Sequence, residues 1–313
     1  MLHYETLTWP QLDALDRAKT VAFIAFSPLE EHGPHLPIGT DLYMASYFAE
    51  TIAARMEAQR PDLTALVLPP VPLGAGTIPM RGSINITVDV VYDIARQMGS
   101  ALARDGFRHI VFTNGHLAPW HLLALENAAM WVSRRYRVGA VAPAASLARD
   151  LIRRDAIAGE LGQRMAAEEV AELLKASHGG MLETSVMLHL HPELVQPSYR
   201  SLPRLTHSAL RGWRGRTPAH WPGYVGSPAS GEAEWGAMAV ERLIDLGTQL
   251  VIRMTDEGRA AAQAGRLLPR VPFWLARRRV TALAGAAIAG VGATVLATRL
   301  LTIGGKQRGR RNA

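Results

Sequence analysis

The sequence contains no cysteine. This absence excludes disulfide bonds, thiolate nucleophiles, cysteine-ligated zinc sites and iron–sulfur clusters. A metal ion would therefore have to be bound by histidine, aspartate and glutamate. The first nine residues also lack an apolar run and include His3 and Glu5, so we expect no secretory signal there.

Acidic residues are absent from the last part of the chain. Eleven of the 34 lysines and arginines lie beyond Glu257, whereas all 27 acidic residues lie within residues 1–257. The formal net charge of +7 therefore divides into −4 for residues 1–257 and +11 for the tail. With 48% hydrophobic and 19% charged residues overall, the composition is that of a globular protein, and disorder throughout the body is excluded.

The tail divides into a basic linker at residues 258–279, an apolar segment at 280–303 and a basic end at 304–313. Residues 280–298 carry no charge, and small residues recur there at every fourth position. The length and the basic flanks predict a membrane-spanning or anchoring helix, with an alanine-rich helix packed on the protein or between subunits as the alternative. We therefore expect membrane association through this C-terminal hydrophobic helix, contact with lipids, and a cytoplasmic body. Few aromatic residues accompany the basic ones, which argues against nucleic-acid binding.

Short apolar runs alternate with longer helical patterns over the first 190 residues. This alternation predicts an α/β fold with a mainly parallel sheet and helices on both of its faces. The predicted strands are 21–26, 64–68, 110–113 and 138–141, and the predicted helices are 41–56, 88–103, 120–134, 162–177 and 232–255. Residues 196–230 lack either period and are rich in proline, glycine and serine, so we expect a long loop that forms a wall or lid of a site.

Carboxylates and imidazoles gather directly after the first predicted strand. Glu30, Glu31, His32 and Asp41 lie within twelve residues of one another. Because side chains alternate along an extended backbone, we expect Glu30 and His32 to point to one side and Glu31 to the other. Asp41 opens the next predicted helix, where a lone carboxylate would ordinarily be explained by the helix N-terminus.

Two further clusters follow later in the chain. His116 comes directly after the third predicted strand, and His178 and Glu183 follow the helix predicted at 162–177. A lone His116 would more often be structural, but parallel strands carry their sites at their carboxyl ends, where we expect the first two clusters to converge. Mixed imidazole and carboxylate ligands suit zinc, manganese or ferrous iron. Five candidate ligands exceed the need of one tetrahedral ion, and a bridging carboxylate could hold two ions, with Asp41 the best candidate.

Residues 30–41, Glu-Glu-His-Gly-Pro-His-Leu-Pro-Ile-Gly-Thr-Asp, resemble the signature of the creatininase (creatinine amidohydrolase) family, which usually has Gln at the second position. The resemblance continues at 114–116, 178–185 and 226–228, and covers residues 5 to 250. It implies a three-layer α/β/α fold, two divalent metal ions, zinc foremost, and hydrolysis of a non-peptide, cyclic amide or formamide C–N bond by metal-activated water. It also implies that His178 transfers a proton, that Asp41 bridges the ions, and that the metal ligands are Glu30, His32, Asp41, His116 and Glu183.

The sequence departs from the family pattern at two places near these residues. Glu31 replaces the usual Gln and adds a negative charge, and we take it with His178 as a candidate catalytic residue. Residues 117–119, Leu-Ala-Pro, lack the carboxylate that creatinine-cleaving members have there, which argues against creatinine as substrate. We expect a small amide substrate and a homo-oligomer. The alternative is a membrane-tethered metal-binding or scaffold protein of the same fold without turnover.

Overall fold

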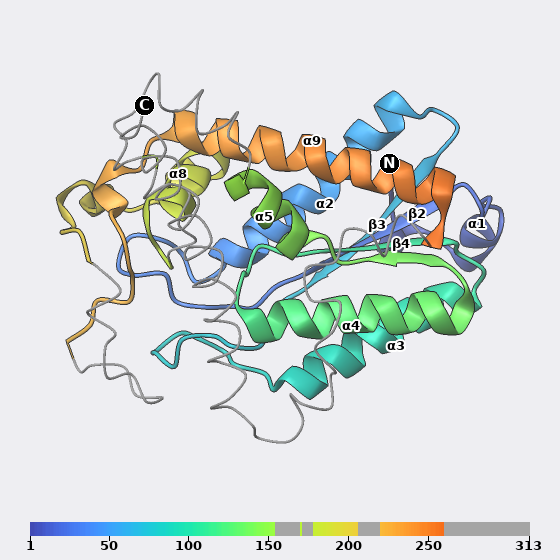
Figure 1. Ribbon diagram of the computed structural model, residues 1–313, viewed down its shortest axis with the longest axis horizontal. Helices are drawn as coiled ribbons and strands as arrows, with labels where there is room; N and C mark the ends of the chain where they lie inside the picture. The colour runs from blue at the N-terminus through green and yellow to red at the C-terminus, as the bar shows by residue number, and fades with distance from the viewer. Residues whose placement is uncertain (154–169, 171–177, 206–219, 260–313) are drawn as a thin grey trace, which may run out of the picture. The chain divides into compact units, whose positions relative to one another are not determined.

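The computed structural model describes residues 1–153, 170, 178–205 and 220–259 (Figure 1). Within these ranges, no helix combines the length and the apolar character that a membrane span requires. The helix predicted at 162–177, apart from residue 170, and the tail beyond residue 259 lie outside the described residues. The predictions made for the linker, the apolar segment and the basic end therefore remain predictions.

A parallel sheet of five strands forms the centre of the fold, in the order β1-β3-β2-β4-β5. Every residue of the central strand β2 is buried, as expected for a strand covered on both faces. All four predicted strands are present, and a two-residue strand, β1, is added at the edge. The strands are β1 (Leu2–His3), β2 (Thr20–Phe26), β3 (Thr64–Val71), β4 (His109–Thr113) and β5 (Gly139–Val141).

Helices cover both faces of the sheet (Figure 1). One core packs against α2 (Thr40–Gln59), α8 (Met181–Leu190) and α9 (Ala233–Glu257). The other core packs against α3 (Val88–Arg104) and α4 (Pro119–Tyr136). Alternate residues of β2 divide between them: Val21, Phe23 and Ala25 lie in the first core, and Ala22, Ile24 and Phe26 in the second. The predicted α/β class with helices on both faces is confirmed.

The remaining elements are short. They comprise α1 (Trp9–Asp13), α5 (Ala144–Arg153) and the 3-10 turns at Tyr4–Thr6, Pro192–Leu194, Pro197–Ser201 and Pro228–Ser230. Within the described part of 196–230, the last two of these turns and one antiparallel bridge, Leu205 to Gly226, agree with the irregular segment predicted there.

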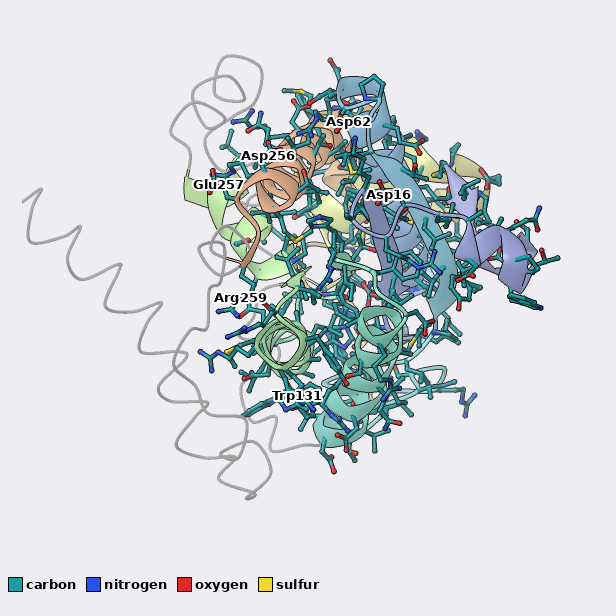
Figure 2. All side chains as sticks on the ribbon, turned by 90° about the vertical axis from the view of Figure 1, so that its right-hand side faces the viewer. Asp16, Asp62, Trp131, Asp256, Glu257 and Arg259 are labelled. Atoms are coloured by element: carbon teal, nitrogen blue, oxygen red, sulfur yellow. The ribbon has the colours of Figure 1, made fainter. Side chains whose placement is uncertain are left out.

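The amino-end edge of the sheet carries exposed acidic side chains that have ordinary partners. Asp62, in the connection that leads into β3, and Asp256, near the end of α9, both pair with Arg60, at 2.8 and 2.6 Å (Figure 2). Asp16 and Glu257 lie at the same end of the molecule. Exposed ion pairs of this kind contribute little to stability. Functional sites of parallel sheets lie at the opposite edge, where the strands have their carboxyl ends.

Gly115 sets the distance between the carboxyl end of β4 and the first turn of α2. A Cβ atom on this residue would collide with the backbone carbonyl oxygen of Asp41 and lie 3.0 Å from Cβ of Met44. The missing side chain therefore lets the turn after β4 lie directly against the start of α2. This close approach places His116 beside Asp41.

Candidate metal centre

The five predicted ligands meet at the carboxyl ends of β2 and β4, in two groups that share Asp41. Glu30, Asp41 and His116 form one group, and His32, Asp41 and Glu183 form the other. Nδ1 of His116 lies 3.0 Å from Oδ2 of Asp41 and 3.1 Å from Oε2 of Glu30. Nε2 of His32 lies 3.3 Å from Oδ1 of Asp41 and 3.6 Å from Oε2 of Glu183. Each oxygen of the Asp41 carboxylate thus faces a different group.

Several atoms in these groups are buried and have no hydrogen-bond partner among the described residues outside the groups themselves. They are Oε2 of Glu30, both carboxylate oxygens of Asp41, Nε2 of His32 and Nε2 of His116. Burying an unpaired charged group costs several kcal/mol, so native structures rarely leave such atoms without a partner. A divalent cation would supply the missing interaction for the carboxylates. The donor set therefore fits metal binding, and every group of potential ligands found in the described residues lies at this edge.

Neighbouring groups orient the ligands. Nδ1 of His32 lies 3.0 Å from the backbone oxygen of Glu30, which leaves Nε2 of the ring directed at Asp41. The other oxygen of Glu30 accepts a hydrogen bond from the backbone N–H of Ile78. The Glu183 carboxylate accepts one from the backbone N–H of Gly179 at 2.6 Å. Such outer partners fix the ring tautomer and the carboxylate orientation of metal ligands.

The protonation states of this cluster follow from its charges. Burial lowers the pKa of His32, but Asp41, Glu183 and Glu30 outweigh burial and raise the pKa to about 10. Burial likewise opposes the effect of Asp41 and Glu30 on His116, whose pKa also rises to about 10. Burial would raise the pKa of Asp41, yet the two imidazoles hold it well below its usual range. In the absence of metal, protons on both rings therefore offset part of the carboxylate charge, and a cation would replace them.

His178 and Glu31 form a pair beside the two groups. Nε2 of His178 lies 2.6 Å from the backbone oxygen of Glu31 and 3.5 Å from its carboxylate. The His178 ring centroid is 4.2 Å from that of His32, and His178 could also complete a third ligand group with Glu30 and His32. Glu31 belongs to none of the three groups. Its carboxylate is buried and accepts a hydrogen bond from the backbone N–H of Gly33 at 3.0 Å.

Part of the long irregular segment contacts this pair, in agreement with the predicted site wall. The backbone N–H of Val225 donates to the carbonyl oxygen of His178 at 2.7 Å. The Trp221 ring lies 6.5 Å from the His178 ring, and its indole N–H donates to the backbone oxygen of Tyr224.

His121 is a supporting residue for which the sequence analysis predicts no role. Its ring is fully buried, lies 5.4 Å from the His116 ring and bonds through Nε2 to the backbone oxygen of Phe26 at 3.1 Å. Burial, reinforced by the charge of His116, lowers the pKa of His121 to about 3, so the ring is neutral. Its place on the first turns of α4, five residues after His116, was visible in the sequence, but its contact with His116 was not.

Comparison with known proteins gives consistent results. The family described as "Creatininase: Creatinine amidohydrolase" matches residues 5–251. A "Mycofactocin precursor peptide peptidase" of Mycobacterium ulcerans (strain Agy99) is 25% identical over 258 residues, covering 79% of this chain and 87% of the relative. The crystal structure of creatinine amidohydrolase (creatininase) matches with a TM-score of 0.61 at 22% identity, covering 82% of this chain and 97% of that one. A mutant creatininase described as Zn-Zn type matches with a TM-score of 0.61 at 21% identity, over 82% of this chain and 97% of that chain. At this identity, the structural matches establish the shared fold.

Proposed function

The chain belongs to the creatininase family, a family of hydrolases acting on C–N bonds, and we propose that it cleaves a small amide with the help of two divalent ions. One observation carries this proposal: the buried carboxylate of Asp41 faces His116 with one oxygen, at 3.0 Å, and His32 with the other, at 3.3 Å. A purely structural role for Asp41 at the helix N-terminus would not explain why an imidazole ring lies against each of its carboxylate oxygens.

The proposed ligands are Glu30, Asp41 and His116 for one ion, and His32, Asp41 and Glu183 for the other. This mixture of nitrogen and oxygen donors suits zinc first, with manganese and ferrous iron as alternatives. Divalent ions bound there would activate a water molecule and polarise the carbonyl group of the substrate. The buried walls would exclude bulk water from the reacting groups.

We assign the proton transfer to His178, with Glu31 as its partner. The Nε2–H of His178 donates to the backbone oxygen of Glu31, so Nδ1 is the ring nitrogen that can take up a proton and return it to the leaving nitrogen. The carboxylate of Glu31, 3.5 Å from Nε2, would stabilise the positive charge that the ring carries in between. Glu31 therefore acts on the reaction through His178 rather than as a ligand.

The favoured substrate is a non-peptide, cyclic amide or formamide. A short peptide is the second candidate, because the Mycobacterium ulcerans relative is named a peptidase. Both classes contain the same C–N bond, and Leu117, Ala118 and Pro119 replace the carboxylate expected in creatinine-cleaving members. A panel of lactams, N-formyl compounds, creatinine and short peptides should separate the candidates. Each assay would be run on metal-free protein, on zinc-loaded protein and after chelation.

Two results of this panel would contradict the proposal. A protein that neither contains nor rebinds divalent metal would exclude the centre. A protein that binds two ions yet cleaves none of the compounds would support the alternative, a metal-binding or scaffold protein of the same fold. If the protein is a metal-dependent hydrolase, His116→Ala should abolish hydrolysis. If it is a scaffold protein, the same substitution should leave its scaffold role intact.

We further propose that residues 1–257 form the hydrolase domain, that they assemble as a homo-oligomer in the cytoplasm, and that residues 280–303 attach the protein to membrane lipids. The apolar length of 280–298 and its arginine-rich flanks support the attachment. Cell fractionation with and without residues 271–313 tests it. Recovery of the full chain in the soluble fraction would contradict it, and light scattering of the truncated protein tests the oligomer.

A further inference from the structure

A second buried histidine of the 30–41 loop, His35, reaches the helix that carries Glu183. Nε2 of His35 lies 2.9 Å from the hydroxyl oxygen of Thr184, and both residues are fully buried. The backbone oxygen of His35 also accepts a hydrogen bond from Gln196, just beyond α8, at 2.8 Å. His35 belongs to none of the ligand groups in the described residues, so metal binding does not explain its burial.

The geometry around Thr184 fixes the direction of its hydroxyl group. A Cβ atom on Gly231 would lie 2.7 Å from the Thr184 methyl carbon, so the methyl group fills the space that glycine leaves open. With the methyl group seated there, the hydroxyl is turned toward His35. Thr184 follows Glu183 directly in the first turn of α8, so this contact holds the turn that carries the Glu183 carboxylate.

The two proposed ion sites depend on this contact to different degrees. The ligands of the first site, Glu30, Asp41 and His116, come from the loops after β2 and β4 and from the start of α2, all anchored to the sheet. The second site needs Glu183, which reaches His32 only if α8 is held against the 30–41 loop. The contact between His35 and Thr184 joins those two segments directly.

Building on the proposed two-ion function, we propose that His35 and Thr184 are positioning residues that hold Glu183 in place for the second ion, beside His32 and Asp41. The pair binds no ion itself. Partners of this outer kind change the metal affinity of a site about 10- to 100-fold. Disrupting the pair should lower the affinity for one ion and leave the affinity for the other unchanged.

The test is zinc binding by the full chain, measured by calorimetric titration and by metal analysis after dialysis. Thr184→Val removes the hydroxyl with little change of shape and should weaken one of the two ions about 10- to 100-fold. Thr184→Ser keeps the hydroxyl but loses the methyl group that fixes its direction, so it should restore binding in part. Thr20→Val is the matched control, because Thr20 is also buried and its hydroxyl bonds to the backbone of Asp16, at the opposite edge of the sheet.

A second variant acts on the same contact without removing the hydroxyl. Gly231→Ala should push the Thr184 methyl group aside and weaken binding of the same ion. This variant replaces Thr184→Val in the test if thermal melting shows that Thr184→Val does not fold. Wild-type affinity for both ions in the folded variants, or equal loss of both, would overturn the inference. Wild-type protein that binds two ions but cleaves no amide would defeat the proposed hydrolysis and leave this inference standing.

Discussion

Binding of metal to the centre should release protons, because the two ligand histidines carry them when no ion is present. His32 and His116 both have pKa values of about 10, since buried carboxylates surround each ring. At pH 7 both rings are therefore protonated almost completely. A nitrogen that binds an ion must give its proton up, so each ion should displace one proton from its histidine.

The size of the effect follows from these two values. Two ions should release about two protons at pH 7, whereas two histidines with the ordinary pKa of 6.5 would release only about half a proton together. A proton held with a pKa of about 10 also lowers the apparent affinity at pH 7 by about 1,000-fold for each ion. The apparent affinity of each ion should consequently rise about tenfold for each pH unit between 7 and 9.

The assay is calorimetric titration of the metal-free protein with zinc, in buffers of different ionisation enthalpy at one pH. The dependence of the measured enthalpy on the buffer gives the number of protons released. His116→Gln is the control, and it should lose one ion and one proton while the other ion still binds. Ionisation of a bound water molecule would add to the count, so two protons is a lower limit.

A low proton count would refute this reasoning. Release of half a proton or less on binding two ions, or an affinity that stays constant between pH 7 and 9, would mean that the carboxylates do not hold protons on the rings. The same result would contradict the close packing of Asp41 between His32 and His116. It would leave the family membership of the chain untouched.

Four further outcomes are expected. The metal-free protein should be more stable at pH 7 than at pH 10, because the raised pKa values of His32 and His116 stabilise the folded state. This stabilisation is complete below pH 6.5 and is lost as the pH rises through about 10. Urea unfolding at both pH values measures it, and equal free energies of unfolding would contradict the prediction. Asp41→Asn should abolish binding of both ions and all hydrolysis, as measured by metal analysis and a product assay. Retention of either ion would exclude Asp41 as a ligand that both ions share. Gly115→Ala should destabilise the protein by about 1–3 kcal/mol in thermal unfolding, because its Cβ would meet the Asp41 carbonyl, and an unchanged melting temperature would refute the close approach. The Glu31→Gln variant should still bind both ions in metal analysis, because Glu31 belongs to none of the ligand groups. Loss of one ion would show that Glu31 is a ligand.

The strands and the first two ligand clusters were predictable because local signals specify them. Buried strands such as β2 are short, continuous apolar runs, and the polar residues that follow such runs lie at one edge of a parallel sheet. This reasoning brings Glu30, His32 and His116 together without any knowledge of strand order. The order itself, with β3 and β4 on either side of β2, depends on crossover packing that no local pattern encodes.

Among the elements that escaped prediction, two did so for clear physical reasons. The strand β1 has two residues, too few to show a period. The helix α8 is apolar around most of its circumference, with Met181, Val186 and Met187 buried, so no polar face marks its helical repeat. Its first turn holds Glu183, and the direction of that carboxylate was therefore invisible in the sequence. The role of His35 also escaped prediction, because its contact with Thr184 joins two segments that lie far apart in the sequence.

The charge balance of the site gives a physical meaning to its departure from the family pattern. With neutral imidazoles, the carboxylates of Glu30, Asp41 and Glu183 carry three negative charges, and two divalent ions would bring four positive ones. With Gln at position 31, this surplus of one positive charge would remain until a bound water molecule ionised. The buried carboxylate of Glu31, 3.5 Å from His178, would offset that charge and would be a partner for a protonated ring. We therefore propose that Glu31, which lies outside the ligand groups, would stabilise the positive charge that His178 carries while it exchanges its proton.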